Sequence, residues 1–151
     1  MTPRYVKQGD PLAGRLFFEN TCAKCHTLFG KGGNVGPDLT GSGRKNLDYI
    51  LSNLVDPSAV IDPAYCLTHI LTHDGQFLIS GFLVQQGDTF ATLQTQDAQI
   101  RLEMKDIDEI YTSGKSMMPD GMLQNYTDDQ VRDLLVYLGS SEQVPLGDHA
   151  N

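Results

Sequence analysis

The spacing of apolar residues predicts two helices in the first part of the chain. In "GDPLAGRLFFENT", Asp10 is a suitable N-cap and Pro11 suits the first helical position. This helix should bury one face, which consists of Leu12, Leu16 and Phe17. In "NLDYILSNLV", apolar residues at helical spacing predict a short helix that ends before Pro57. They are Leu47, Ile50, Leu51 and Leu54.

The clearest helical pattern lies near the C-terminus. Thr127 and Gln130 match a capping box, in which the two side chains satisfy backbone N–H groups at the start of a helix. Apolar residues then recur on one face until Gly139, which suits a helix end. They are Val131, Leu134, Leu135 and Leu138.

Between Ala64 and Ile110 the pattern changes to short segments rich in Thr, Leu, Ile, Phe and Val. Turn residues interrupt these segments at Asp74-Gly75, Gly87-Asp88 and Asp97-Ala98. The pattern predicts about four short antiparallel strands. In the following sequence, "KDIDEIYTS" is interpreted as helix or turn and "GKSMMPDGM" as a loop.

The composition is that of one folded domain. The chain has 151 residues, of which 40% are hydrophobic and 20% charged, which is ordinary for a soluble globular protein. Its apolar runs are too short to cross a bilayer, and "MTPRYVKQGD" shows no export signal. The formal net charge of -8 argues against a nucleic-acid partner, because phosphate binding needs a cationic stripe. An acidic surface favours a basic protein partner instead.

Two thiols and an imidazole lie close together in "CAKCH", at Cys22, Cys25 and His26. A zinc site would need two more ligands, which His69 and His73 could supply, although their distance in sequence is unusual for zinc. A thioredoxin-like dithiol would stand at the start of a helix after a buried strand. Here the motif follows a helix and opens into the glycine-rich "LFGKGGNVGPDLTGSG". The remaining interpretation is covalent haem, in which both thiols bond vinyl groups and the histidine binds iron.

The sequence around this motif resembles the class I cytochromes c. Gly14 and Phe18 precede the motif as in the N-terminal helix of that family. The stretch "DLLVYL" matches the C-terminal helix of the family through Leu134, Tyr137 and Leu138. The resemblance implies that these two helices cross and pack tightly, with the glycine allowing close approach near an aromatic ring.

The resemblance also implies the cofactor and its ligands. One haem c would be attached to Cys22 and Cys25, with His26 as an axial ligand. "GPDLTG" looks like the proximal loop of the family, in which the Pro37 carbonyl would accept a hydrogen bond from His26. The sixth ligand should be a methionine of "SMMPDGM", because a thioether favours ferrous iron. In the family this methionine commonly precedes a proline, which selects Met118, with the neighbouring Met117 as the fallback.

Over most of its length the chain is closest to the haem-binding domains of planctomycetes and verrucomicrobia. The matching pieces are "GRLFFENTCAKCH", "GPDLTG", "VDPSAVIDPAY", "THDGQFLISGFL", "DIDEI" and "SMMPDGM". The implied fold is mainly α, a single class I cytochrome c domain over residues 1–151. A small antiparallel β insertion of about four strands, at about 64–110, would separate the central helix from the axial-methionine loop.

The resemblance implies a mono-haem electron carrier and not an enzyme. With His26 and Met118 both on the iron, no position is open for substrate, so only single-electron transfer remains. The donor would be a dehydrogenase domain or partner, and the location periplasmic or otherwise exported. The alternative is a gas sensor or peroxidase-like protein with an open or labile sixth position, and His69 or His73 could also replace the methionine. Packing residues are expected at Met104, Met122 and Cys66.

Overall fold

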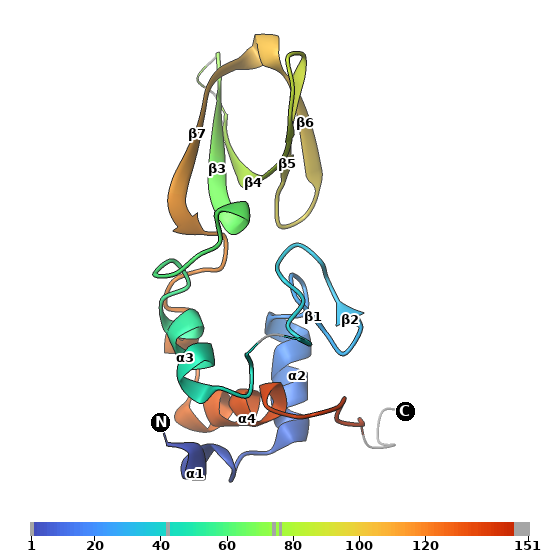
Figure 1. The fold of residues 1–151 in the computed structure, drawn as a ribbon, viewed down its shortest axis with the longest axis vertical. Coiled ribbons are helices and arrows are strands. Elements are labelled where there is room, and N and C mark those ends of the chain that lie inside the picture. The colour runs from blue at the N-terminus through green and yellow to red at the C-terminus, as the bar shows by residue number, and fades with distance from the viewer. Residues whose placement is uncertain (1, 42, 74, 76, 147–151) are drawn as a thin grey trace. The chain divides into compact units, whose positions relative to one another are not determined.

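The computed structural model describes residues 2–41, 43–73, 75 and 77–146, in two compact units (Figure 1). Met1–Val55 together with Gly121–Asn151 form the first, here called the helical unit, and Asp56–Asp120 form the second, the sheet unit. Of the described residues, 32% are helical and 28% lie in strands. The expectation of a mainly α fold is therefore wrong. Among the residues that the structure describes, no helix has the length and apolar character needed to span a membrane.

The helical unit contains the three predicted helices. Its elements in chain order are α1 (Pro3–Val6), α2 (Pro11–Thr21), strands β1 (Thr27–Leu28) and β2 (Lys31–Gly32), α3 (Leu47–Val55), the 3₁₀-helix η3 (Met122–Asn125) and α4 (Asp128–Leu138). Helix α2 begins as predicted, because the Asp10 carboxylate accepts a hydrogen bond from the Leu12 N–H at 2.8 Å. Its buried face differs from the prediction: Gly14, Arg15 and Phe18 are buried, whereas Leu16 is 46% exposed.

The buried face of α2 is set by the crossing of α2 and α4. A Cβ atom added to Gly14 would lie 1.9 Å from the backbone oxygen of Asp133 in α4. This is a steric clash, so only glycine fits at this position. Next to this contact the rings of Phe18 and Tyr137 pack with centroids 5.7 Å apart. Hydrophobic spacing alone did not identify this face, because its central residue is a glycine.

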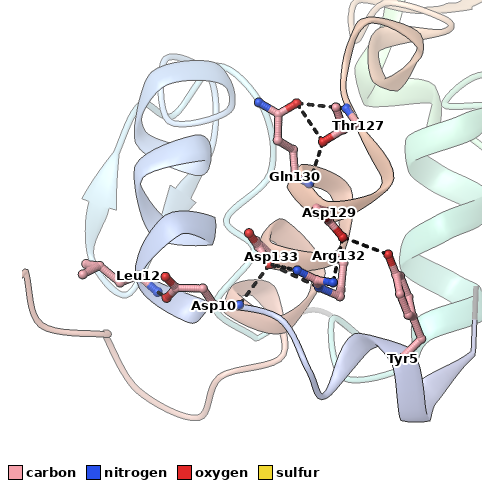
Figure 2. Close-up of polar contacts among 8 residues, drawn as sticks. All are labelled: Tyr5, Asp10, Leu12, Thr127, Asp129, Gln130, Arg132 and Asp133. Carbon is pink, nitrogen blue, oxygen red and sulfur yellow. Dashed lines mark hydrogen bonds and ion pairs between the residues drawn. The ribbon is translucent and has the colours of Figure 1, made fainter.

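Polar contacts fix the start of α4 and tie the N-terminal segment to it (Figure 2). The predicted capping box is present: the Gln130 side chain accepts from the Thr127 N–H at 2.9 Å, and the Thr127 hydroxyl accepts from the Gln130 N–H at 3.3 Å. The carboxylate of Asp133 accepts from the Asp10 N–H at 2.9 Å and also pairs with Arg132. The N-terminal end of α2 is thereby joined to the middle of α4.

The sheet unit is one five-stranded antiparallel sheet with strand order β6-β5-β4-β3-β7. Its elements in chain order are the 3₁₀-helix η1 (Pro63–Tyr65), β3 (Cys66–Thr72), β4 (Leu78–Gln86), β5 (Phe90–Gln94), β6 (Gln99–Glu103), the 3₁₀-helix η2 (Met104–Asp106) and β7 (Ile107–Ser116). The first half of β4 pairs with β3 and the second half with β5. The sheet curls around a core, which consists of Ile70, Ala91, Leu93 and Ile107.

The prediction of about four strands is wrong by one. The four predicted strands correspond to β3 to β6, and their first break falls at Asp74-Gly75, of which Asp74 lies outside the described residues. The fifth strand, β7, contains residues 107–113 of the segment interpreted as helix or turn, whose first two residues lie in η2, and residues 114–116 of the segment interpreted as a loop. It forms because Ile110 pairs with Ile70 of β3 and packs against the core. Asp108 and Glu109 separate Ile107 from Ile110, so the sequence shows no strand-like alternation there, and tertiary pairing outweighs local propensity.

Candidate functional site

The motif Cys22–His26 forms a tight turn at the end of α2. Cys22 is the C-cap of this helix, and its N–H donates to the Phe18 carbonyl at 2.8 Å. The Cys22 carbonyl in turn accepts from the His26 N–H at 3.0 Å. Both thiols and the imidazole are half-buried side chains of one short segment. The structure thus brings together three of the predicted site residues.

The glycine-rich loop lies directly against the backbone of this turn. The Gly33 N–H donates to the Ala23 carbonyl at 2.7 Å. Cβ atoms added to Gly32 and Gly33 would lie 2.2 Å from the His26 carbonyl oxygen and 2.1 Å from that of Lys24. Side chains at either position would push the loop away. The glycines are therefore needed for the loop to enclose the motif.

The same loop fixes the imidazole of His26. The Nδ1 atom lies 2.9 Å from the carbonyl oxygen of Pro37. A carbonyl can only accept a hydrogen bond, so Nδ1 carries the proton and the lone pair of the neutral ring is on Nε2. A Cβ atom on Gly36 would lie 2.7 Å from Cε1 of the ring, so this glycine packs flat against the imidazole. The predicted role of Pro37 has the geometry it requires.

The Cys22 thiol differs from that of a redox dithiol. Burial raises the pKa of the Cys22 thiol to about 12, and the neighbouring Cys25 adds to this shift. A thiol in such surroundings stays protonated near neutral pH, whereas disulfide exchange needs thiolate. Among the described residues, no group of three or more His, Cys, Asp or Glu side chains could hold a metal ion.

The histidines considered as alternative ligands have other contacts within the sheet unit. The two ring nitrogens of His69 lie 2.7 Å from the Ser80 hydroxyl and 3.2 Å from the Ser113 hydroxyl. His73 is exposed and lies 3.5 Å from the carboxylate of Asp108. These contacts link neighbouring strands, as expected for polar residues of a sheet.

Met117 and Met118 belong to the sheet unit, whereas His26 belongs to the helical unit. Met117 lines a cavity of about 330 Å³ together with Leu67 and Ser80. Met118 follows it in a half-buried turn, where its N–H donates to the Ser116 hydroxyl at 3.1 Å. The two methionines thus have different surroundings.

Arg44 is a residue of the helical unit that the sequence analysis missed. Its guanidinium is buried and donates to the carbonyls of Thr40 at 3.1 Å and Leu138 at 2.7 Å, and also to that of Ser140. It lies 4.8 Å from the ring centroid of Phe29. Arg44 therefore fastens the end of the glycine-rich loop to the end of α4. A single arginine in an irregular segment carries no pattern from which this role could be predicted.

Two comparisons place this site among known proteins. Residues 12–63, which include the motif and the loop, match the family model described as Cytochrome c. A protein described as cytochrome c from Theileria annulata is 43% identical over 61 residues, which cover 37% of this chain and 52% of that protein. The chain thus spans about half the length of this relative. Both findings support a c-type cytochrome, a family that binds covalently attached haem c.

Proposed function

We propose that this protein is a mono-haem c-type cytochrome that carries single electrons. The observation that carries the proposal is the geometry of His26, whose Nδ1 is bonded to the Pro37 carbonyl at 2.9 Å. This bond orients the ring and makes Nε2 the atom available to a metal. Cys22 and Cys25 flank the same turn as free thiols.

The residues present fit a covalently bound haem. Thioether formation needs two unpaired thiols next to the iron ligand, and the turn supplies them. The glycines at 32, 33 and 36 keep the loop against the turn without side chains that would displace it. When bound, haem c supplies an iron that exchanges one electron between its ferrous and ferric forms. The contribution of the chain is to hold the His26 ring in one orientation and tautomer.

For the sixth ligand we propose Met118. Its thioether is a soft, neutral donor that favours ferrous iron, and Pro119 follows it as in the resembling family. Met117 is the weaker candidate, since its side chain lines a cavity within the sheet unit. If His26 and Met118 both hold the iron, no position would be open for substrate, which would leave electron transfer rather than catalysis.

The partners and location follow from the same proposal. The electron donor would be a dehydrogenase domain or partner, and the acceptor another redox protein. Covalent haem attachment outside the cytoplasm would make the protein periplasmic or otherwise exported. The segments shared with planctomycete and verrucomicrobial haem-binding domains support a place within that subgroup.

Spectroscopy of protein from a host with haem c maturation tests the proposal. We expect the mass to increase by one haem, sharp bands on reduction, and the weak far-red band that methionine ligation gives to ferric haem c. The Cys22→Ala, Cys25→Ala double variant should lose covalent haem.

Replacement of each methionine tests the sixth ligand. Met118→Ala should lose the far-red band and gain carbon monoxide binding, whereas the matched variant Met117→Leu should keep the wild-type spectrum. If the native wild-type protein, without substitution or denaturant, binds carbon monoxide, this would contradict His/Met ligation. It would favour a gas sensor or peroxidase-like protein.

A further inference from the structure

Ser116 ends β7 and contacts the segment that contains Met118. Its hydroxyl accepts a hydrogen bond from the Met118 N–H at 3.1 Å. Its own N–H donates to the Ser58 hydroxyl at 3.1 Å. Both contacts lie inside the sheet unit, and both residues are half-buried. The serine pair therefore joins the end of a strand, the methionine turn and the segment after α3.

A second contact closes the same turn. The Lys115 ammonium lies 3.8 Å from the carboxylate of Asp120. These two residues precede and follow the two methionines and Pro119 in the sequence. Both side chains are exposed, so this pair is screened by solvent and salt and contributes little. The hydrogen bonds of Ser116 are partly buried and are the stronger constraint on the backbone of Met118.

We propose that Ser116 and Ser58 are positioning residues for the axial methionine. They keep the Met118 backbone in one conformation, so that its thioether stays on the iron instead of giving way to an external ligand. This inference rests on the proposed His/Met ligation. It assigns a role to "DPSAV", a segment that the haem site itself does not explain.

A competing ligand measures how firmly the methionine is held. External imidazole binds ferric iron only when the thioether has left, so its apparent affinity reports the equilibrium between bound and released methionine. Ser116→Ala removes one backbone-holding hydrogen bond, and the affinity for imidazole should rise about fivefold, as loss of about 1 kcal/mol predicts. The far-red band of the ferric protein should weaken in parallel.

Two variants separate this role from a general effect on the sheet. Ser116→Thr keeps the hydroxyl and should restore the wild-type affinity. Ser113→Ala removes hydrogen bonds from the same strand, including one to the Leu67 carbonyl at 3.2 Å, but none to residues 117–120. Its imidazole affinity should equal that of the wild type. If Ser116→Ala takes up no haem, Ser58→Ala tests the same pair of hydrogen bonds. This variant should also bind imidazole more tightly.

The outcomes distinguish the inference from the proposed function. A wild-type protein without any methionine signature would overturn His/Met ligation itself. A wild-type protein with that signature, together with unchanged imidazole affinity in Ser116→Ala and Ser58→Ala, would refute only the positioning role. Equal increases in Ser116→Ala and Ser113→Ala would also refute it, because they would indicate a general weakening of the sheet.

Discussion

At the scale of single residues, the site depends on positions where a side chain is absent. Gly36→Ala would place a Cβ atom 2.7 Å from Cε1 of His26, so that either the ring or the loop must move. We expect the holoprotein to lose about 1–3 kcal/mol of stability, the range for overpacking. Denaturant unfolding of the haem-loaded protein measures this loss, and the ferric spectrum reports the changed histidine.

Gly41→Ala is the matched control for this substitution. Gly41 belongs to the same loop, but a Cβ atom there would meet nothing within 4 Å. Its stability and spectrum should stay close to those of the wild type. If both variants lose the same stability, the cost comes from the backbone freedom of glycine and not from contact with the imidazole.

The sequence indicates candidate reactive residues of the site more clearly than the residues that support them. Two cysteines, the adjacent histidine and the proline of "GPDLTG" stand out because their residue types and spacing are tied to haem chemistry. Nothing in the sequence indicates which loop glycine contacts the imidazole ring, or that Arg44 binds the end of α4. These roles arise from contacts between segments that are distant in the chain.

At the scale of elements, the crossing of α2 and α4 predicts a strong effect of Gly14→Ala. Helix propensity alone would stabilise the variant by about 1 kcal/mol. The added Cβ would lie 1.9 Å from the Asp133 backbone oxygen, and backbone cannot move aside as a flexible side chain can. The clash should win, with a net loss of about 3 kcal/mol or more in the free energy of unfolding.

The neighbouring position tests the assignment of this loss to the crossing. Ala13→Gly changes helix propensity in the opposite sense at an adjacent, half-buried site, and should cost about 1 kcal/mol. Chemical denaturation of both variants measures the difference. A Gly14→Ala protein as stable as the wild type would mean that α2 and α4 do not pack this closely.

Arg44, which binds the C-terminal end of α4, gives a second prediction at this scale. Its planar guanidinium donates to three carbonyls at once, whereas the point charge of a lysine would leave some of them unpaired in a buried place. Arg44→Lys should lower the free energy of unfolding by about 2 kcal/mol, as for charged hydrogen bonds. The converse change at the exposed neighbour, Lys45→Arg, should be neutral. Equal stability of all three proteins would contradict the proposed fastening of the loop.

The sheet shows why element prediction succeeded in part. Strands β3 to β6 are separated by turn residues that punctuate the sequence, so they could be predicted. Strand β7 has no such boundary, because η2 leads directly into it and the polar Asp108 and Glu109 follow its first residue. Its pairing with β3 depends on a partner far away in the sequence. The mainly α fold class was wrong because strands hold nearly as many of the described residues as helices, 28% against 32%.

At the scale of the whole chain, the helical unit is built from two segments separated by the entire sheet unit. For helices α2 and α4 to pack, the two ends of the segment Asp56–Asp120 must come close together. The entropic cost of closing such a loop grows only slowly with its length. A long insertion is therefore tolerable where the packing of these helices is as close as at Gly14. The prediction of one cytochrome c domain over residues 1–151 stays a prediction.

The formal net charge of -8 gives a prediction for the proposed electron carrier as a whole. An acidic surface attracts cationic redox reagents and repels anionic ones, and salt screens both effects. Oxidation of the ferrous protein by tripositive cobalt tris-phenanthroline should therefore slow several-fold as ionic strength rises from about 0.01 M to about 0.15 M. Oxidation by trinegative ferricyanide should accelerate over the same range.

Stopped-flow measurement of both rates separates the charge around the electron-transfer site from the total charge. Reagents of equal and opposite charge serve as controls for each other, because any effect of salt on the protein itself would change both rates in the same direction. If the anionic reagent is instead the faster at low salt and slows as salt is added, the surface through which the electron leaves is positive. The acidic residues would then lie elsewhere, and the physiological partner would present an acidic rather than a basic surface.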